Sequence, residues 1–137
     1  NSVRSIPGFG PIITAMTLGA IGNPFRFNDH KQVLKMAGLD LSASRSGKYS
    51  LNAIASISKK GNTELRYALY QAAFIASTRS QNFKSYFNDK IKAREQERGI
   101  KIKMRVKLSA KMLVIAWTSM KKRENFNPDF LKGTLEK

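Results

Sequence analysis

The chain has 137 residues, of which 42% are hydrophobic, enough to bury one core in a single domain. Its 25 Lys and Arg residues outnumber 9 Asp and Glu residues, and the resulting net charge of +16 indicates a polyanionic partner, with nucleic acid the first candidate. The lack of cysteine excludes disulfides and Cys-based zinc sites, and no apolar run reaches the roughly 18 residues of a membrane span. We expect a soluble, cytoplasmic domain without membrane contact.

The first predicted element is a glycine-rich turn that opens a helix. Residues 6–11, IPGFGP, combine glycines suited to tight turns with a proline suited to the first helical position. This looks like the hairpin and second helix of a helix-hairpin-helix element, in which the amides of Gly8 and Gly10 lie against a phosphate. The alternative is an ordinary turn before a core helix. Three- and four-residue spacing predicts the buried face of that helix: Ile12, Ala15, Met16 and Gly19.

A short helix is predicted next, from Asp29 to Ala37. Asn28 is its expected N-cap, and Gly38 suits the left-handed position that ends a helix. His30 is the only histidine, and we interpret it as a polar surface residue rather than a catalytic one. The inward residues are expected to be Val33, Leu34 and Ala37.

A long polar segment rich in serine, glycine and lysine separates this helix from the next predicted one. Connections in compact domains are typically a few residues long, and longer ones are usually functional or disordered. This segment carries Ser46-Gly47 at its centre and a Lys59-Lys60 pair near its end. We therefore expect function to reside here.

Two helices are predicted after the polar segment. The first begins at Asn62 or Thr63, ends near Thr78 and has a narrow apolar face of small residues: Leu65, Leu69, Ala72, Ala73 and Ala76. The second opens at Ser80 or Asn82 and ends at Gly99, with a buried stripe of Phe83, Tyr86, Phe87 and Ile91. Ten Lys/Arg and three Asp/Glu lie between Arg79 and Lys107, and some of these cations are expected to follow a nucleic-acid backbone.

The segment from Lys101 to Lys107 alternates like a strand, but no second strand is available to pair with it, so a helix is predicted. That helix ends at the basic run Lys121-Lys122-Arg123, and Trp117 is interpreted as a core residue rather than a base-stacking platform. Residues 124–137 are expected to form a flexible tail. The predicted fold is an all-α, compact bundle of five or six helices with a long polar loop, whose folded domain spans residues 1–123.

Four segments in order carry a family resemblance: SIPGFGPIITAMTLGAIG, FRFNDHKQVLKMAGL, the Ser-Gly loop, and ISKKGNTELRYALYQAA. Together they resemble the C-terminal transposase domain of the insertion-sequence "one-ten" family, also grouped as one-sixteen/one-ten/nine-oh-two, from Ser5 to about Trp117. The family's members are serine transposases guided by a bridge RNA. The resemblance therefore implies DNA and a guide RNA as partners and a homo-oligomer in the full-length protein.

The resemblance also implies a catalytic residue. In the family, the nucleophilic serine follows the Ala-Gly-Leu motif after six residues and precedes glycine, which identifies Ser46 after Ala37-Gly38-Leu39. Leu41 departs from the family, which commonly has proline there. The segment from Leu51 to Ser56 also departs, because family members often carry a more basic sequence there. The competing loop serines are Ser42, Ser44, Ser50 and Ser58.

Five cations are the candidates for phosphate contact around this serine, and solubility is the alternative explanation for each: Arg45, Lys48, Lys59, Lys60 and Arg66. The scattered carboxylates of the chain predict no metal site and no bound cofactor. Divalent metal, Mg²⁺, is implied instead for an N-terminal RuvC-like domain that this chain lacks. Because the chain begins at Asn1 in mid-pattern, we expect a fragment that is inactive alone.

The leading hypothesis is thus the DNA-binding and strand-transfer domain of an insertion-sequence transposase. One alternative is a non-catalytic helix-hairpin-helix module that binds nucleic acid. Another is a ribosomal or structural RNA-binding protein, which would bind folded RNA and break no DNA strand.

Overall fold

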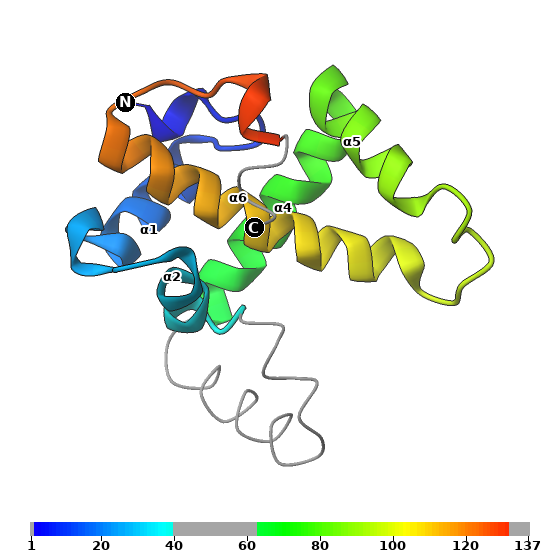
Figure 1. The fold of residues 1–137 in the computed structure, drawn as a ribbon, viewed down its shortest axis with the longest axis horizontal. Helices are drawn as coiled ribbons and strands as arrows, with labels where there is room; N and C mark the ends of the chain where they lie inside the picture. Colours follow the sequence, from blue (N-terminus) through cyan, green and yellow to red (C-terminus); the bar gives the residue numbers. More distant parts are fainter. Residues whose placement is uncertain (1, 40–62, 132–137) are drawn as a thin grey trace, which may run out of the picture.

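Helix α4, Thr63–Arg79, lies at the centre of the fold (Figure 1). The computed structural model describes residues 2–39 and 63–131, and within them α4 contacts every other α-helix. The face that makes these contacts is the one that the sequence predicts, with Leu65, Ala68, Leu69, Ala72, Ala73 and Ala76 all buried. Small side chains allow neighbouring backbones to approach closely, so α4 serves as the packing surface of the whole bundle.

The described residues form helices and no strand, which confirms the all-α prediction. None of these helices is both long enough and apolar enough to cross a membrane. Besides α4 they comprise α1 (Pro11–Ile21), α2 (His30–Ala37), α5 (Gln81–Ile91), α6 (Ile100–Lys122) and the 3-10 turns Val3–Ser5, Pro24–Arg26 and Pro128–Leu131.

Helix α1 begins at Pro11, as predicted, but its predicted buried face is wrong. Ile12 is 75% exposed, whereas the buried residues are Thr14, Thr17 and Ile21. Apolar residues surround this helix on all sides, so their spacing does not single out one face. Thr17 is buried because its hydroxyl donates to the Ile13 carbonyl at 2.8 Å, which leaves its methyl group to pack.

Helix α6 is the longest of the described helices, and it includes the segment from Lys101 to Lys107, which confirms the choice of helix there. It ends at the basic run, where Arg123 adopts a left-handed conformation with φ 56°. Trp117 is 5% exposed, and its Nε1–H donates to the Pro24 carbonyl at 2.7 Å. The interpretation of Trp117 as a core residue is therefore confirmed.

Helix α5 follows Ser80, as predicted, but it stops at Ile91, so the predicted end at Gly99 is wrong. The buried stripe of α5 ends at Ile91, and the residues that follow are mostly exposed, so a longer helix would have nothing to bury. Gly99, at φ 72°, instead precedes α6 as its N-cap. Most of α5, the loop 92–99 and the start of α6 project from the body (Figure 1), and we call residues 84–107 the arm.

The start of the segment expected as a tail lies against the body. Phe126 stacks on Phe83 with ring centroids 5.3 Å apart, and Phe130 meets Phe126 edge-on at 6.1 Å. The Phe126 amide donates to the Ser5 hydroxyl at 2.6 Å, and Leu131 is buried. Residues 124–131 thus tie the N-terminal turn to α5.

Candidate nucleic-acid interface

Helix α2 ends in a motif that fixes the direction in which the chain enters the polar segment. Asp29 caps its start by accepting from the Gln32 amide at 3.0 Å, so the prediction of Asn28 as N-cap is off by one residue. At its end the Gly38 amide donates to Lys35 O at 3.1 Å and the Leu39 amide to Leu34 O at 2.8 Å. With Gly38 at φ 74°, this pair of bonds is a Schellman motif, as the glycine predicted.

Arg66, in the first turn of α4, contacts the end of α2 at Gly38. A Cβ built on Gly38 would lie 2.6 Å from Arg66 Nη1, so the guanidinium rests directly on the glycine. Within the described part of the chain, Nη1 is buried and has no hydrogen-bond partner, and burial lowers the pKa of Arg66. A cation held in this way favours an anionic ligand, because an anion would supply the missing acceptor.

The other loop residues singled out in the sequence lie outside the described residues: Arg45, Ser46, Lys48, Lys59 and Lys60. The structure does bring together the two described ends that flank these residues. Gly38, at the end of α2, lies against Arg66, in the first turn of α4. Of the five proposed phosphate contacts, Arg66 is thus the one whose surroundings are described.

Gly8 and Gly10 have different surroundings. Gly8 has φ 89°, and a Cβ added there would collide with the carbonyl oxygen of Ala72 on α4. Close packing on α4 is therefore a sufficient reason for glycine at position 8. Gly10, by contrast, lies in open space, because a Cβ added there would meet no atom within 4 Å. It is the N-cap of α1, and the first turn of α1 contains no acidic residue.

The described residues contain no group of three or more His, Asp or Glu residues that could hold a metal ion. The described residues therefore offer no set of ligands that fits a divalent metal ion, and we assign them no metal-dependent chemical step.

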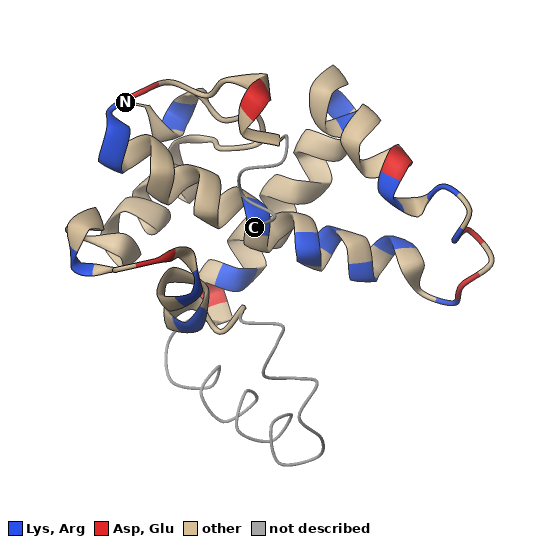
Figure 2. Cartoon of the chain, viewed as in Figure 1, with Lys and Arg blue, Asp and Glu red and all other residues tan. Residues whose placement is uncertain are grey.

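Lys and Arg residues are frequent along the arm and along the lower face of the body (Figure 2). Within the arm, Arg94 donates to Glu97 at 3.0 and 3.1 Å, and Lys103 donates to it at 3.2 Å. These bonds hold the pKa of Glu97 below its ordinary value. The sequence identified this stretch as the most basic one but did not identify which of its cations converge. Lys90, Arg94 and Lys107 of this stretch line one hollow together with Tyr86, as described below.

The fold and its charge define a strongly basic, all-helical domain whose glycine turn packs on one central helix. The model of the Transposase IS116/IS110/IS902 family matches residues 1–88, which include the glycine turn, Ser46 and all of α4. The chain therefore belongs to this transposase family, and the prediction of the family from its motifs is confirmed. Comparisons with curated proteins and with solved structures give no match.

Proposed function

We propose that this chain is the DNA-binding and strand-transfer domain of an insertion-sequence transposase, with Ser46 as the nucleophile. The observation that carries the proposal is the family match, which spans Ser46 together with both motifs that flank it. The spacing of Ser46 from the Ala-Gly-Leu motif supports the choice among the loop serines. The net charge of +16 supports DNA as the substrate.

In the proposed reaction, the Ser46 hydroxyl attacks a DNA phosphorus in line with the leaving oxygen. The Oγ–P bond forms, the bond from phosphorus to one deoxyribose oxygen breaks, and the serine proton passes through solvent to that oxygen. The product is a phosphoserine link that conserves the phosphodiester energy, so the strand can be joined to a new end by the reverse step.

Arg66 supports this proposal from the base of the segment. Its partly buried guanidinium offers fixed positive charge beside the point where the chain leaves α2, and such charge stabilises the extra negative charge of the transition state. Arg45, Lys48, Lys59 and Lys60 are proposed as further phosphate contacts. Activation of the hydroxyl is proposed to come from an N-terminal RuvC-like domain of the full-length protein, where divalent metal would supply Lewis-acid chemistry.

A guide RNA and a homo-oligomer complete the proposal, because strand exchange requires several reacting ends to be held together. The test is to incubate the complete gene product with guide RNA, Mg²⁺ and target DNA, and to look for a covalent protein–DNA adduct. The adduct is expected to disappear in Ser46→Ala and to persist in the matched variant Ser58→Ala.

An adduct that survives Ser46→Ala would disprove the nucleophile. DNA binding with no adduct from any variant would favour the non-catalytic helix-hairpin-helix module. Preference for folded RNA, with little affinity for DNA and no strand breakage, would instead favour a structural RNA-binding protein.

A further inference from the structure

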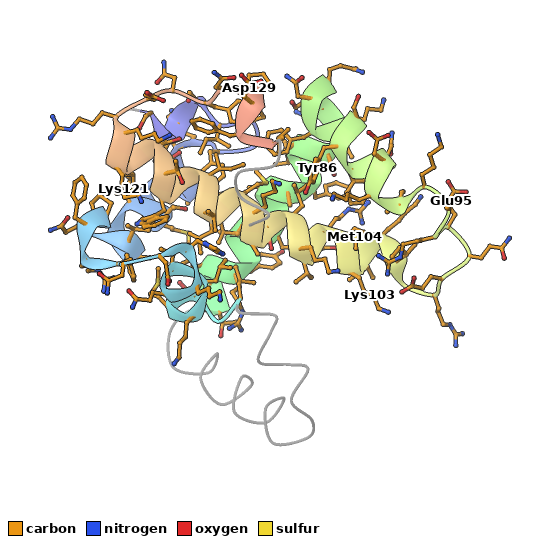
Figure 3. All side chains as sticks on the ribbon, in the orientation of Figure 1. Tyr86, Glu95, Lys103, Met104, Lys121 and Asp129 are labelled. Carbon is orange, nitrogen blue, oxygen red and sulfur yellow. The ribbon has the colours of Figure 1, made fainter. Side chains whose placement is uncertain are left out.

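A groove runs between α5 and α6 and reaches the start of α2. It consists of two hollows of about 410 and 230 Å³ that share Tyr86 and Lys107 in their linings. We call the pair the Tyr86 groove, and in Figure 3 Tyr86 and Met104 mark its α5 and α6 sides. Its polar lining consists of His30, Tyr86, Lys90, Arg94, Lys107 and Lys111.

The centre of the groove is one aromatic ring with two cations. Lys90 Nζ, from α5, lies 5.2 Å from the centroid of the Tyr86 ring, and Lys111 Nζ, from α6, lies 4.7 Å from it. Cation–π attraction holds each ammonium group at the ring, but two like charges gathered at one ring repel each other. A phosphodiester bound in the groove would be attracted by both ammonium groups.

The charged residues that line the groove are all basic. None of the described residues that line the two hollows is Asp or Glu. Arg94, at the tip, shares its charge with Glu97, whereas Lys107 lines both hollows and is exposed to solvent. The spacing of Lys107 and Lys111 places both on one side of α6, toward α5.

The size of the groove indicates which polyanion it fits. Hollows of 410 and 230 Å³ hold groups the size of a nucleotide, whereas a rigid duplex cannot enter the space between two packed helices. A cationic groove that contains an aromatic ring is the usual arrangement for binding single strands, whose backbone follows the charges and whose bases contact the ring.

We propose that the Tyr86 groove binds a single-stranded nucleic acid through its phosphodiester backbone, with Lys107 and Lys111 as the principal contacts. This inference deepens the proposed function, on which it rests, by adding a binding site for an unpaired strand. Both lysines lie beyond residues 1–88, so the family match does not assign the site.

The first test measures binding of the chain to oligo-dT of about 20 nucleotides by fluorescence anisotropy. Lys107→Glu is expected to weaken binding about tenfold or more and to reduce the salt slope by about 0.7, which corresponds to one lost phosphate contact on a single strand. The matched control is Lys122→Glu, an exposed lysine of the same helix about 22 Å farther along its axis. This control is expected to change affinity by about twofold or less.

The second test probes the ring. Tyr86→Leu is expected to weaken oligo-dT binding about fivefold or more, while Tyr86→Phe retains most of it because the aromatic face remains. Thermal unfolding followed by circular dichroism checks that each variant is folded. Lys107→Glu changes an exposed side chain, so it keeps the proposal testable even if Tyr86→Leu does not fold.

Two further ligands identify the strand. Oligo-U and oligo-dT are both expected to respond to Lys107→Glu, because they share the phosphodiester, and the one that the unmodified chain binds more tightly identifies the natural source. A duplex of the same length is expected to respond about equally to Lys107→Glu and Lys122→Glu. The proposal is overturned if the single strands also respond equally to both variants, or if the duplex loses as much affinity as the single strands in Lys107→Glu.

Failure of this proposal can be told apart from failure of the proposed function. Ser46→Ala is expected to leave oligo-dT affinity unchanged while it abolishes the covalent adduct. An adduct that persists in Ser46→Ala, together with intact Lys107-dependent binding of oligo-dT, would therefore contradict Ser46 as the nucleophile and leave the groove proposal standing.

Discussion

Gly8 and Gly10 occupy one short motif, yet only Gly8 is constrained by its neighbours. Gly8→Ala would force a side chain into the Ala72 carbonyl at a φ that alanine rarely adopts, so we expect a loss of about 2–3 kcal/mol in the free energy of unfolding. Gly10→Ala meets open space at φ −76° and is expected to change stability by less than about 0.5 kcal/mol. Urea denaturation of both variants measures the difference. Equal losses would contradict the packing role of Gly8.

Gly10 also offers a test of the predicted phosphate contact. If its amide meets a phosphate, Gly10→Ala weakens DNA binding without loss of stability, because an added methyl group would hold the phosphate away. Unchanged affinity in a mobility-shift assay would leave the glycine turn with a purely structural role.

Arg66 is a residue at which function and stability are expected to oppose each other. Its guanidinium is partly buried, and Nη1 has no hydrogen-bond partner among the described residues, so Arg66→Met removes a desolvated charge and retains the packing of the alkyl chain. We expect an unfolding midpoint in urea that is unchanged or higher, together with weaker DNA binding. A lower midpoint with unchanged DNA binding would show that Arg66 acts through structure alone.

At the scale of elements, the segment 124–131 holds the two ends of the described chain together. Phe126 stacks on the buried Phe83, and its amide bonds to Ser5, so Phe126→Ala is expected to cost about 2 kcal/mol in the free energy of unfolding. Phe25→Ala is the matched control, because that ring is 68% exposed, and a change below about 0.5 kcal/mol is expected. Equal effects in thermal unfolding would contradict the tie between the segment and α5.

The elements also show where sequence patterns predict structure well. Residues 63–79 were predicted closely, because the small buried face of α4 repeats over four turns and its flanks carry helix-start signals. The end of α5 was mispredicted because Gly99 can either end one helix or begin the next. Only the absence of anything to pack against beyond Ile91 decides between the two roles.

At the scale of the whole molecule, the charge of +16 dominates the expected behaviour in solution. If duplex DNA contacts at least about four phosphates, affinity falls about 100-fold between 50 and 200 mM salt, because bound counterions are released. Isothermal titration at several salt concentrations measures this slope. Affinity that is insensitive to salt would contradict backbone-dominated binding.

The sequence by itself determined the helical class, the basic character and the family, because periodicity, composition and motif spacing are local properties of the chain. It is also the source of the proposal that Ser46 is the nucleophile. The tertiary structure decided which face of α1 is buried, that Gly8 packs on Ala72, and that Arg66 rests on Gly38. It also decided that Tyr86, Lys107 and Lys111 share one groove. These contacts depend on which helices meet and at what distance. They form only when helices that are far apart in the sequence pack together on α4.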